Sequence, residues 1–138
     1  MEEISVYSLE IKKLLKEEKV DPLLINKKTK ELEQLILKTP WYSRYCDEID
    51  HPIEELMEHK LYQEALLIIL AIKKKESCSL GMAYYNSKAG ICYFELKDYK
   101  NAELSFYYTL SDDEDYIDEI RPYLDALRNN KDLKLTYF

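Results

Sequence analysis

Two stretches of the chain repeat one pattern at a spacing of 37 residues, and this repeat constrains the fold more than any other feature. The stretches are MEHKLYQEALLIILAI (57–72) and FELKDYKNAELSFYYTL (94–110). Three residue pairs keep the same register between them: Tyr62 and Tyr99, Ala65 and Ala102, and Ile69 and Phe106. A period in this range is typical of helical solenoids, in which each unit buries its apolar face against the next unit.

The chain is poor in the residues that turns require. It has two glycines and four prolines in 138 residues, whereas all-β folds need both residue types in their many turns. Apolar residues instead recur at spacings of three and four, as at Ile4, Tyr7, Ile11 and Leu14, which indicates amphipathic helices. We therefore predict an all-α fold of about seven helices. They are expected over residues 3–18, 22–39, 52–60, 62–76, 79–96, 99–110 and 113–129, with a short helical turn in 41–49.

Local signals predict where three of these helices begin. Asp21 followed by Pro22 is typical of an N-cap and a proline in the first turn. Asp50-His51-Pro52 predicts a second helix start in the same way. The stretch Ser111-Asp112-Asp113-Glu114 has a capping-box pattern, so we expect it to begin the last helix. Pro122 is expected to kink that helix.

The longest apolar run, ALLIILAI at 65–72, is too short to cross a bilayer. Glu64 and the lysines at 73–75 continue a helical register at its two ends. A helix that is apolar all round is buried on all sides. We expect an inner helix of a stacked array here, with a buried strand as the alternative.

Residues 83–112 resemble a tetratricopeptide repeat, which is an antiparallel helix pair of about 34 residues. Six residues match the family's pattern when Ala83 takes its first position: Gly90, Tyr93, Tyr99, Ala102, Phe106 and Leu110. Gly90 and Ala102 would let the two backbones approach closely, and the aromatic residues would fill the space beside them. Residues 96–98, Leu-Lys-Asp, would form the tight turn.

The resemblance implies a single domain that forms a right-handed α-α superhelix of antiparallel helix pairs. The expected parts are N-terminal helices or a degenerate repeat at 1–45, repeats at 46–82 and 83–112, a capping helix at 113–130 and a tail at 131–138. The first copy fits less well, because Ile53 stands where the pattern has glycine. The second copy departs from the pattern at Asn86 and Thr109.

In this family the first helix of each pair lines a concave face that binds partners. The matching positions are Tyr84, Ser87, Ile91, Phe94 and Glu95 in the second repeat, and Asp47, Asp50, Glu54, Met57 and Glu58 in the first. The implied groove is apolar and aromatic at one end and acidic at the other, which suits a protein or peptide with apolar anchors and some basic residues. Core or plain solvent-facing roles are the alternative, above all for the acidic group, whose register Pro52 disturbs.

Charge and cysteine content bound the partners and the compartment. The formal net charge is −7 and the pI is about 5.0, so we expect no nucleic-acid partner. The N-terminus, MEEISVYSLE, lacks the pattern of a signal peptide, and we expect no membrane partner. Three cysteines without a close pair are typical of a reducing compartment, so a cytoplasmic location is expected.

The sequence has no recognisable pattern of catalytic or metal-binding residues. The candidate zinc ligands are Cys46, His51, His59, Cys78 and Cys92, and no C-x-x-C or H-x-x-x-H spacing joins them. Cys92, between Ile91 and Tyr93, has the pattern of a small core residue. Neither histidine has a Ser or Cys partner at a recognisable spacing. We therefore expect no metal, no cofactor and no enzymatic activity.

These features favour a protein-binding adaptor or chaperone. Small acidic chains of tandem tetratricopeptide repeats are similar to the chaperones that hold translocator proteins of bacterial type III secretion. An immunity or regulatory protein on the same scaffold and a self-assembling homodimer are the alternatives. The 13 tyrosines fit a binding role, since exposed tyrosine is enriched at interfaces. Tyr107 and Tyr108 are the second choice for a contact surface.

Overall fold

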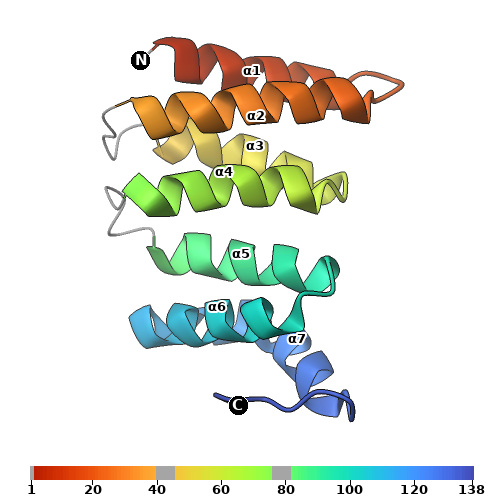
Figure 1. Ribbon diagram of the computed structural model, residues 1–138, viewed down its shortest axis with the longest axis vertical. Coiled ribbons are helices and arrows are strands. Elements are labelled where there is room, and N and C mark those ends of the chain that lie inside the picture. Colours follow the sequence, from red (N-terminus) through yellow and green to blue (C-terminus); the bar gives the residue numbers. More distant parts are fainter. Residues whose placement is uncertain (1, 40–45, 76–81) are drawn as a thin grey trace. The chain divides into compact units, whose positions relative to one another are not determined.

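The computed structural model describes residues 2–39, 46–75 and 82–138, and for Glu2 and residues 46–51 it describes the backbone alone. Within these ranges the chain is all-α, as the sequence predicts, with seven α-helices and one 3-10 helix (Figure 1). The elements are α1 (Glu2–Leu15), α2 (Pro22–Lys38), α3 (Cys46–Glu58), α4 (Tyr62–Lys75), α5 (Met82–Glu95), α6 (Tyr99–Asp112), η3 (Glu114–Tyr116) and α7 (Ile117–Asn129).

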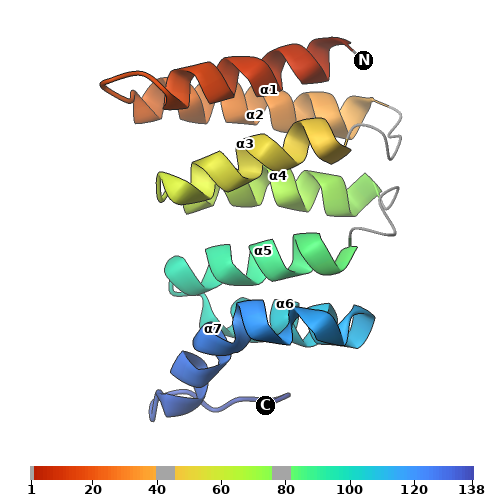
Figure 2. The same cartoon turned by 180° about the vertical axis from the view of Figure 1, so that it is seen from behind.

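The chain forms two compact units, Met1–Cys78 and Ser79–Phe138. In the first unit, α1 packs against α2 and α3, and α4 packs against α2 and α3. Helices α2 and α4 lie on one side of this unit and α1 and α3 on the other (Figures 1 and 2). Its fully buried large side chains are Ile4, Ile11, Ile25, Leu32, Ile36, Ile53, Leu56, Ile68, Ile69 and Ile72. The Asn26 amide also donates to the Glu64 carboxylate across 3.0 Å, which ties α2 to α4.

In the second unit, α5 and α6 form an antiparallel hairpin with the most extensive contact of any helix pair. Helix α7 packs on both helices and buries Ile120, Leu124 and Leu127. These residues lie in the stretch 113–130 that the sequence predicts to be a capping helix. Pro122 lies inside α7, whose helical bounds continue on both sides of it.

The predicted apolar helix at 65–72 is confirmed as part of α4. Six of its eight residues are buried, namely Ala65, Leu66, Ile68, Ile69, Ala71 and Ile72, and the other two are half-buried. No helix in the described ranges is long and apolar enough to cross a membrane. The N-cap of α2 is confirmed as well, since the Asp21 carboxylate accepts hydrogen bonds from the amides of Leu23 and Leu24.

The same turn joins α3 to α4 and α5 to α6. Lys60 and Lys97 both adopt a left-handed backbone, with φ of 61° and 66°. The amide that follows each lysine donates back to the carbonyl five residues earlier, from Leu61 to Leu56 and from Asp98 to Tyr93, each at 2.8 Å. This is the Schellman motif that often ends a helix. The turn and the helices α4 and α6 that follow it therefore recur at 37 residues, from Tyr62–Lys75 to Tyr99–Asp112.

The predicted start of a helix at Asp50-His51-Pro52 is wrong. Helix α3 begins at Cys46 and carries Pro52 in its interior. An interior proline removes one backbone hydrogen bond and usually breaks a helix. Here the ring of Pro52 is buried next to Ile53, so apolar burial accompanies that loss.

The predicted capping box at residues 111–114 is also wrong. Ser111 and Asp112 form the last turn of α6, and the Ser111 hydroxyl donates to the Tyr107 carbonyl of that helix. Asp113 caps the short η3 instead, where its carboxylate accepts from the Asp115 amide. Because Ser111 lies inside α6 and α7 begins only at Ile117, the serine is not placed to cap α7.

Candidate functional site

The predicted contact residues of the second unit follow one strip of α5. Tyr84, Ile91 and Phe94 are separated by seven and three residues, which places them along one side of a helix. Tyr84 and Phe94 are half-buried, whereas Ile91 is only 7% exposed. The two aromatic side chains therefore present most of the accessible apolar surface of this strip.

Phe94 packs among aromatic residues of the neighbouring helices. Its ring meets the edge of Tyr99 from α6 at 5.5 Å between centroids, and that of Tyr123 from α7 at 5.2 Å. Edge-to-face pairs at such distances are favourable beyond the area that they bury. Phe94 thus helps to hold α7 on the hairpin, and only part of its surface faces solvent.

Tyr84 lies under a lysine that bridges two helices. The Lys88 ammonium sits 5.3 Å from the centre of the Tyr84 ring and makes a 2.9 Å ion pair with Glu119 of α7. Tyr85 meets Tyr84 edge to face at 5.2 Å. The Tyr84 ring is therefore held in place, and a fixed ring loses little conformational entropy when it contacts a partner.

Ser87 and Glu95 have contrasting positions on α5. Ser87 is fully buried, and its hydroxyl donates to the Tyr84 carbonyl at 2.7 Å. Glu95, in the last turn of α5, is exposed. The strip thus has two half-buried aromatic residues and an exposed carboxylate at one end, with Ser87 and Ile91 beneath its surface.

The acidic group of the first unit lies on α3. Glu54 and Glu58 are exposed, and Met57 between them is half-buried. The side chains of Asp47 and Asp50 lie outside the described residues. Helices α3 and α5 belong to different compact units, so the single groove that would join them stays a prediction.

The first unit also has an open groove of about 740 Å³ between α1 and α2. Lys28 lines this groove, 3.2 Å from the Glu10 carboxylate, 4.0 Å from that of Glu31, and 5.5 Å from the middle of the Tyr7 ring. Hydrogen bonding to Glu10 raises the pKa of Lys28, and hydrogen bonding to Glu31 raises the pKa of Tyr7. The charges of this groove therefore largely neutralise one another.

Cys92 is a core residue in the structure. It is a free thiol with no exposed surface, and burial raises its pKa to about 12. Burial also raises the pKa of the neighbouring Tyr93 phenol. A thiol that stays protonated is neither a good nucleophile nor a metal ligand. Among the described residues, no three His, Cys, Asp or Glu side chains lie close enough together to hold a metal ion.

Sequence reasoning missed one site, where Glu103 of α6 meets residues 136–137. Glu103 is only 4% exposed. Its carboxylate accepts hydrogen bonds from the Thr136 amide at 3.0 and 2.8 Å and from the Tyr137 amide at 2.9 Å. The signal that could have revealed it is the register of the repeat, since Glu103 stands where the first copy has the buried Leu66.

No protein-family model, no curated protein and no solved structure matches this chain.

Proposed function

We propose that this chain is a non-enzymatic protein-binding module, an adaptor or chaperone that holds a segment of another protein along α5. The observation that carries the proposal is the pair of half-open aromatic side chains on one strip of that helix, Tyr84 and Phe94. Both are packed by their neighbours and so are fixed before a partner arrives. Rigid aromatic anchors of this kind contribute much of the affinity of protein interfaces.

The proposed scaffold is a tetratricopeptide-like right-handed superhelix. Two recurrences support it. The left-handed turn at Lys60 returns 37 residues later at Lys97, and the bounds of α4 are shifted by the same 37 residues in α6. In this arrangement the proposed contact residues are Tyr84, Ser87, Ile91, Phe94 and Glu95 on α5, with Glu54, Met57 and Glu58 on α3. Ser87 and Ile91 would support the strip from below.

The chemistry of this surface favours a partner segment with apolar side chains and some basic residues. Glu95, Glu54 and Glu58 are exposed carboxylates on the proposed helices. Opposite charge at such positions speeds association and selects the partner more than it adds affinity. A net charge of −7 also disfavours nucleic acid. We place this activity in the cytoplasm.

A homodimer is the second candidate, and exposed apolar residues of the first unit favour it. Val6 and Leu9 on α1 are each 51% exposed, and Leu23 at the start of α2 is 84% exposed. The open ends of helical arrays associate when apolar side chains remain uncovered there. Light scattering of the purified chain distinguishes this candidate, since it predicts twice the mass of one chain.

The test of the main proposal places a photo-crosslinking amino acid at Tyr84 of the full chain. After irradiation in a lysate of the source cells, we expect a discrete crosslinked protein that mass spectrometry identifies. The same amino acid at Lys100, which is exposed on α6, is the matched control. The crosslinked partner must then bind the purified wild-type chain by calorimetry. Equal crosslinking at both positions, or no binding in the purified pair, would contradict the proposal.

A further inference from the structure

The segment 135–138 is held on α6 by contacts that a foreign segment could also make. Glu103 is buried and fully occupied by two successive backbone amides, those of Thr136 and Tyr137. A buried carboxylate is strongly unfavourable without hydrogen-bond donors, and these two amides supply them. Successive amides of an extended strand point to opposite sides, so a chain that turns both toward one carboxylate must bend, as this chain does at Thr136. Backbone amides are common to all residue types except proline, so these contacts select a backbone conformation rather than one sequence.

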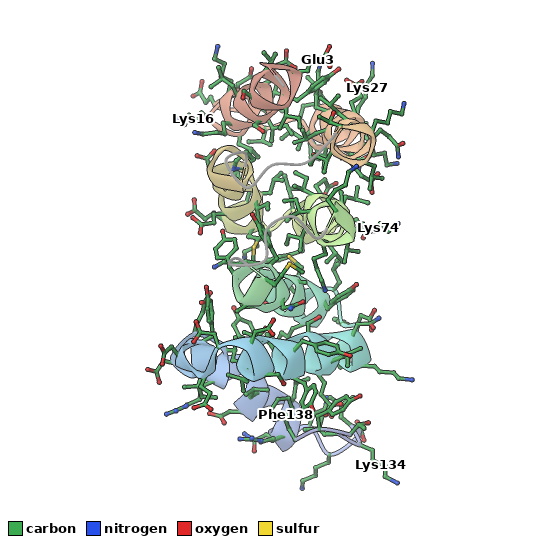
Figure 3. The ribbon with its side chains drawn as sticks, turned by 90° about the vertical axis from the view of Figure 1, so that its left-hand side faces the viewer. Glu3, Lys16, Lys27, Lys74, Lys134 and Phe138 are labelled. Atoms are coloured by element: carbon green, nitrogen blue, oxygen red, sulfur yellow. The ribbon has the colours of Figure 1, made fainter. Side chains whose placement is uncertain are left out.

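Side chains supply the selectivity that backbone contacts lack. The ring of Tyr137 stacks on Tyr107 of α6, with 4.3 Å between centroids and 23° between planes. Phe138 lies beside the last helix, 5.8 Å from the Arg128 guanidinium, whereas Lys134 points away from the ribbon (Figure 3). Backbone hydrogen bonds for affinity combined with side-chain contacts for specificity are a usual way in which peptides are recognised.

We propose that Glu103 and Tyr107 form a recognition site for a peptide with a bent backbone, and that residues 135–138 occupy this site from within the same chain. The ligand class is a segment whose backbone bends so that two successive amides face one carboxylate, with an aromatic side chain at the second of them. Such a segment from another protein binds only after it displaces residues 135–138. The site lies on α6 and is separate from the proposed strip on α5.

The tether between α7 and residues 135–138 explains how the internal segment competes. The Leu133 amide donates to the Asn130 carbonyl, and the Asp132 amide donates to the Asn130 side chain. This turn reverses the chain after α7 and directs it to α6. A segment on a short tether has an effective concentration of roughly millimolar, so a free peptide meets strong competition in the wild-type chain.

The test uses a fluorescent peptide of residues 131–138, KDLKLTYF, with both ends blocked, titrated against the full chain by anisotropy. Replacing Tyr137 and Phe138 by Ala in the protein weakens its own segment and leaves α6 unchanged. We expect this variant to bind the peptide at least about tenfold more tightly than the wild type, which is the effect of losing one good contact from the competitor. Equal affinity for the two proteins would overturn the proposal.

Variants of the site itself, made in that same loosened protein, complete the test. Glu103→Gln should weaken peptide binding at least about tenfold, because one charge-assisted acceptor of two amides is lost. Glu114→Gln is the matched control and should have no effect, since Glu114 is exposed on η3. Tyr107→Ala removes an exposed ring and leaves the core intact, so it remains informative if Glu103→Gln does not fold. Unchanged affinity in Tyr107→Ala would contradict the proposal.

Amide hydrogen exchange of the wild-type chain tests the internal occupant directly. The amides of Thr136 and Tyr137 should be protected, and Glu103→Gln should remove this protection while Glu114→Gln retains it. Exchange of both amides at the rate of an unstructured peptide in the wild type would overturn the internal occupancy. A concentration-dependent wild-type dimer that disappears in the Tyr137→Ala, Phe138→Ala variant would also overturn it, because the occupant would then come from a second copy.

Discussion

Position 90 requires glycine because the ring of Phe106 packs directly against it. A Cβ atom at this position would lie 2.6 Å from Cδ1 of Phe106 and closer still to Cε1. The sequence predicts the same close approach but assigns the contact to Ala102, whereas the nearest atoms all belong to Phe106. In the first unit the corresponding positions hold Ile53 and Ile69, which are both fully buried. The glycine and phenylalanine that meet between α5 and α6 thus correspond to two isoleucines of intermediate size in α3 and α4.

This packing predicts that Gly90→Ala destabilises the protein. Alanine in a helix interior is normally more stable than glycine by about 0.5–1 kcal/mol. Overpacking a core costs about 1–3 kcal/mol, and Phe106 has no room to move because it is fully buried. We therefore expect a net loss of about 1 kcal/mol in the free energy of unfolding. Urea denaturation of the full chain measures it.

A double-mutant cycle with Phe106→Leu provides the control. The smaller leucine leaves room for the new methyl group, so Gly90→Ala should be neutral or stabilising in the Phe106→Leu background. Equal losses in both backgrounds would mean that the clash does not involve Phe106.

The buried thiol of Cys92 predicts a dependence of stability on alkaline pH. Its pKa rises from 9.0 to about 12 on burial, so the folded chain keeps the proton while the unfolded chain loses it. Below pH 9 both the folded and the unfolded state hold the proton, so this thiol does not make the free energy of unfolding depend on pH. Between pH 9 and 12 the free energy of unfolding should fall by about 1.4 kcal/mol per pH unit relative to Cys92→Ala. Parallel stability curves for the two proteins from pH 8 to 10 would contradict this.

At the scale of elements, the turn at Lys97 predicts a stabilising substitution. A residue with a Cβ in the left-handed region is disfavoured by about 1–2 kcal/mol, and glycine's greater freedom in the unfolded chain offsets part of that gain. Lys97→Gly should therefore raise the free energy of unfolding by about 0.5–1 kcal/mol, and Lys60→Gly should do the same. Thermal denaturation checks both variants. Lys30→Gly, at an exposed position inside α2, must show the opposite sign.

Helix α7 is predicted to act as the cap of the second unit. Leu124 is 1% exposed, so Leu124→Ala should cost about 2–4 kcal/mol and loosen α7 from the α5–α6 hairpin. Denaturation and binding of a hydrophobic dye together measure this effect. Asp125→Ala, at the exposed neighbouring position, should change stability by less than about 0.5 kcal/mol. Equal stability of both variants would contradict the capping role.

Most helices could be predicted because their apolar spacing and their caps agree. Asp21 and the turn at 96–98 are examples in which local chemistry and the apolar pattern indicate the same boundary. The two errors arose where a short signal opposed the surrounding helix. Pro52 has the pattern of a helix start but lies buried inside α3, and Ser111 has the pattern of a cap but bonds one turn back. In both cases the longer helix outweighs the local preference.

At the scale of the whole molecule, the sequence predicts the all-α fold and the periodic hairpins. It does not predict that residues 136–137 bind to Glu103 on α6. The hairpins leave a signature in side chains, such as Ala65 and Ala102, that recur at one spacing. The contact of residues 136–137 with α6 depends on backbone amides, which leave no residue-type signature. Its one trace is a carboxylate, Glu103, in a buried register. The predicted strip on α5 was placed by register alone, and register does not show that Ser87 and Ile91 lie beneath its surface.

The affinity of the crosslinked partner for the full chain, measured by calorimetry at fixed salt, tests the central claim most directly. If the strip on α5 is the binding surface, Tyr84→Ala should weaken binding at least about thirtyfold, as expected for the loss of about 2 kcal/mol at an aromatic anchor. Tyr108→Ala on α6, where the ring is 51% exposed, is the matched control and should bind as the wild type does. A folded Tyr84→Ala variant that binds as tightly as the wild type would contradict the account.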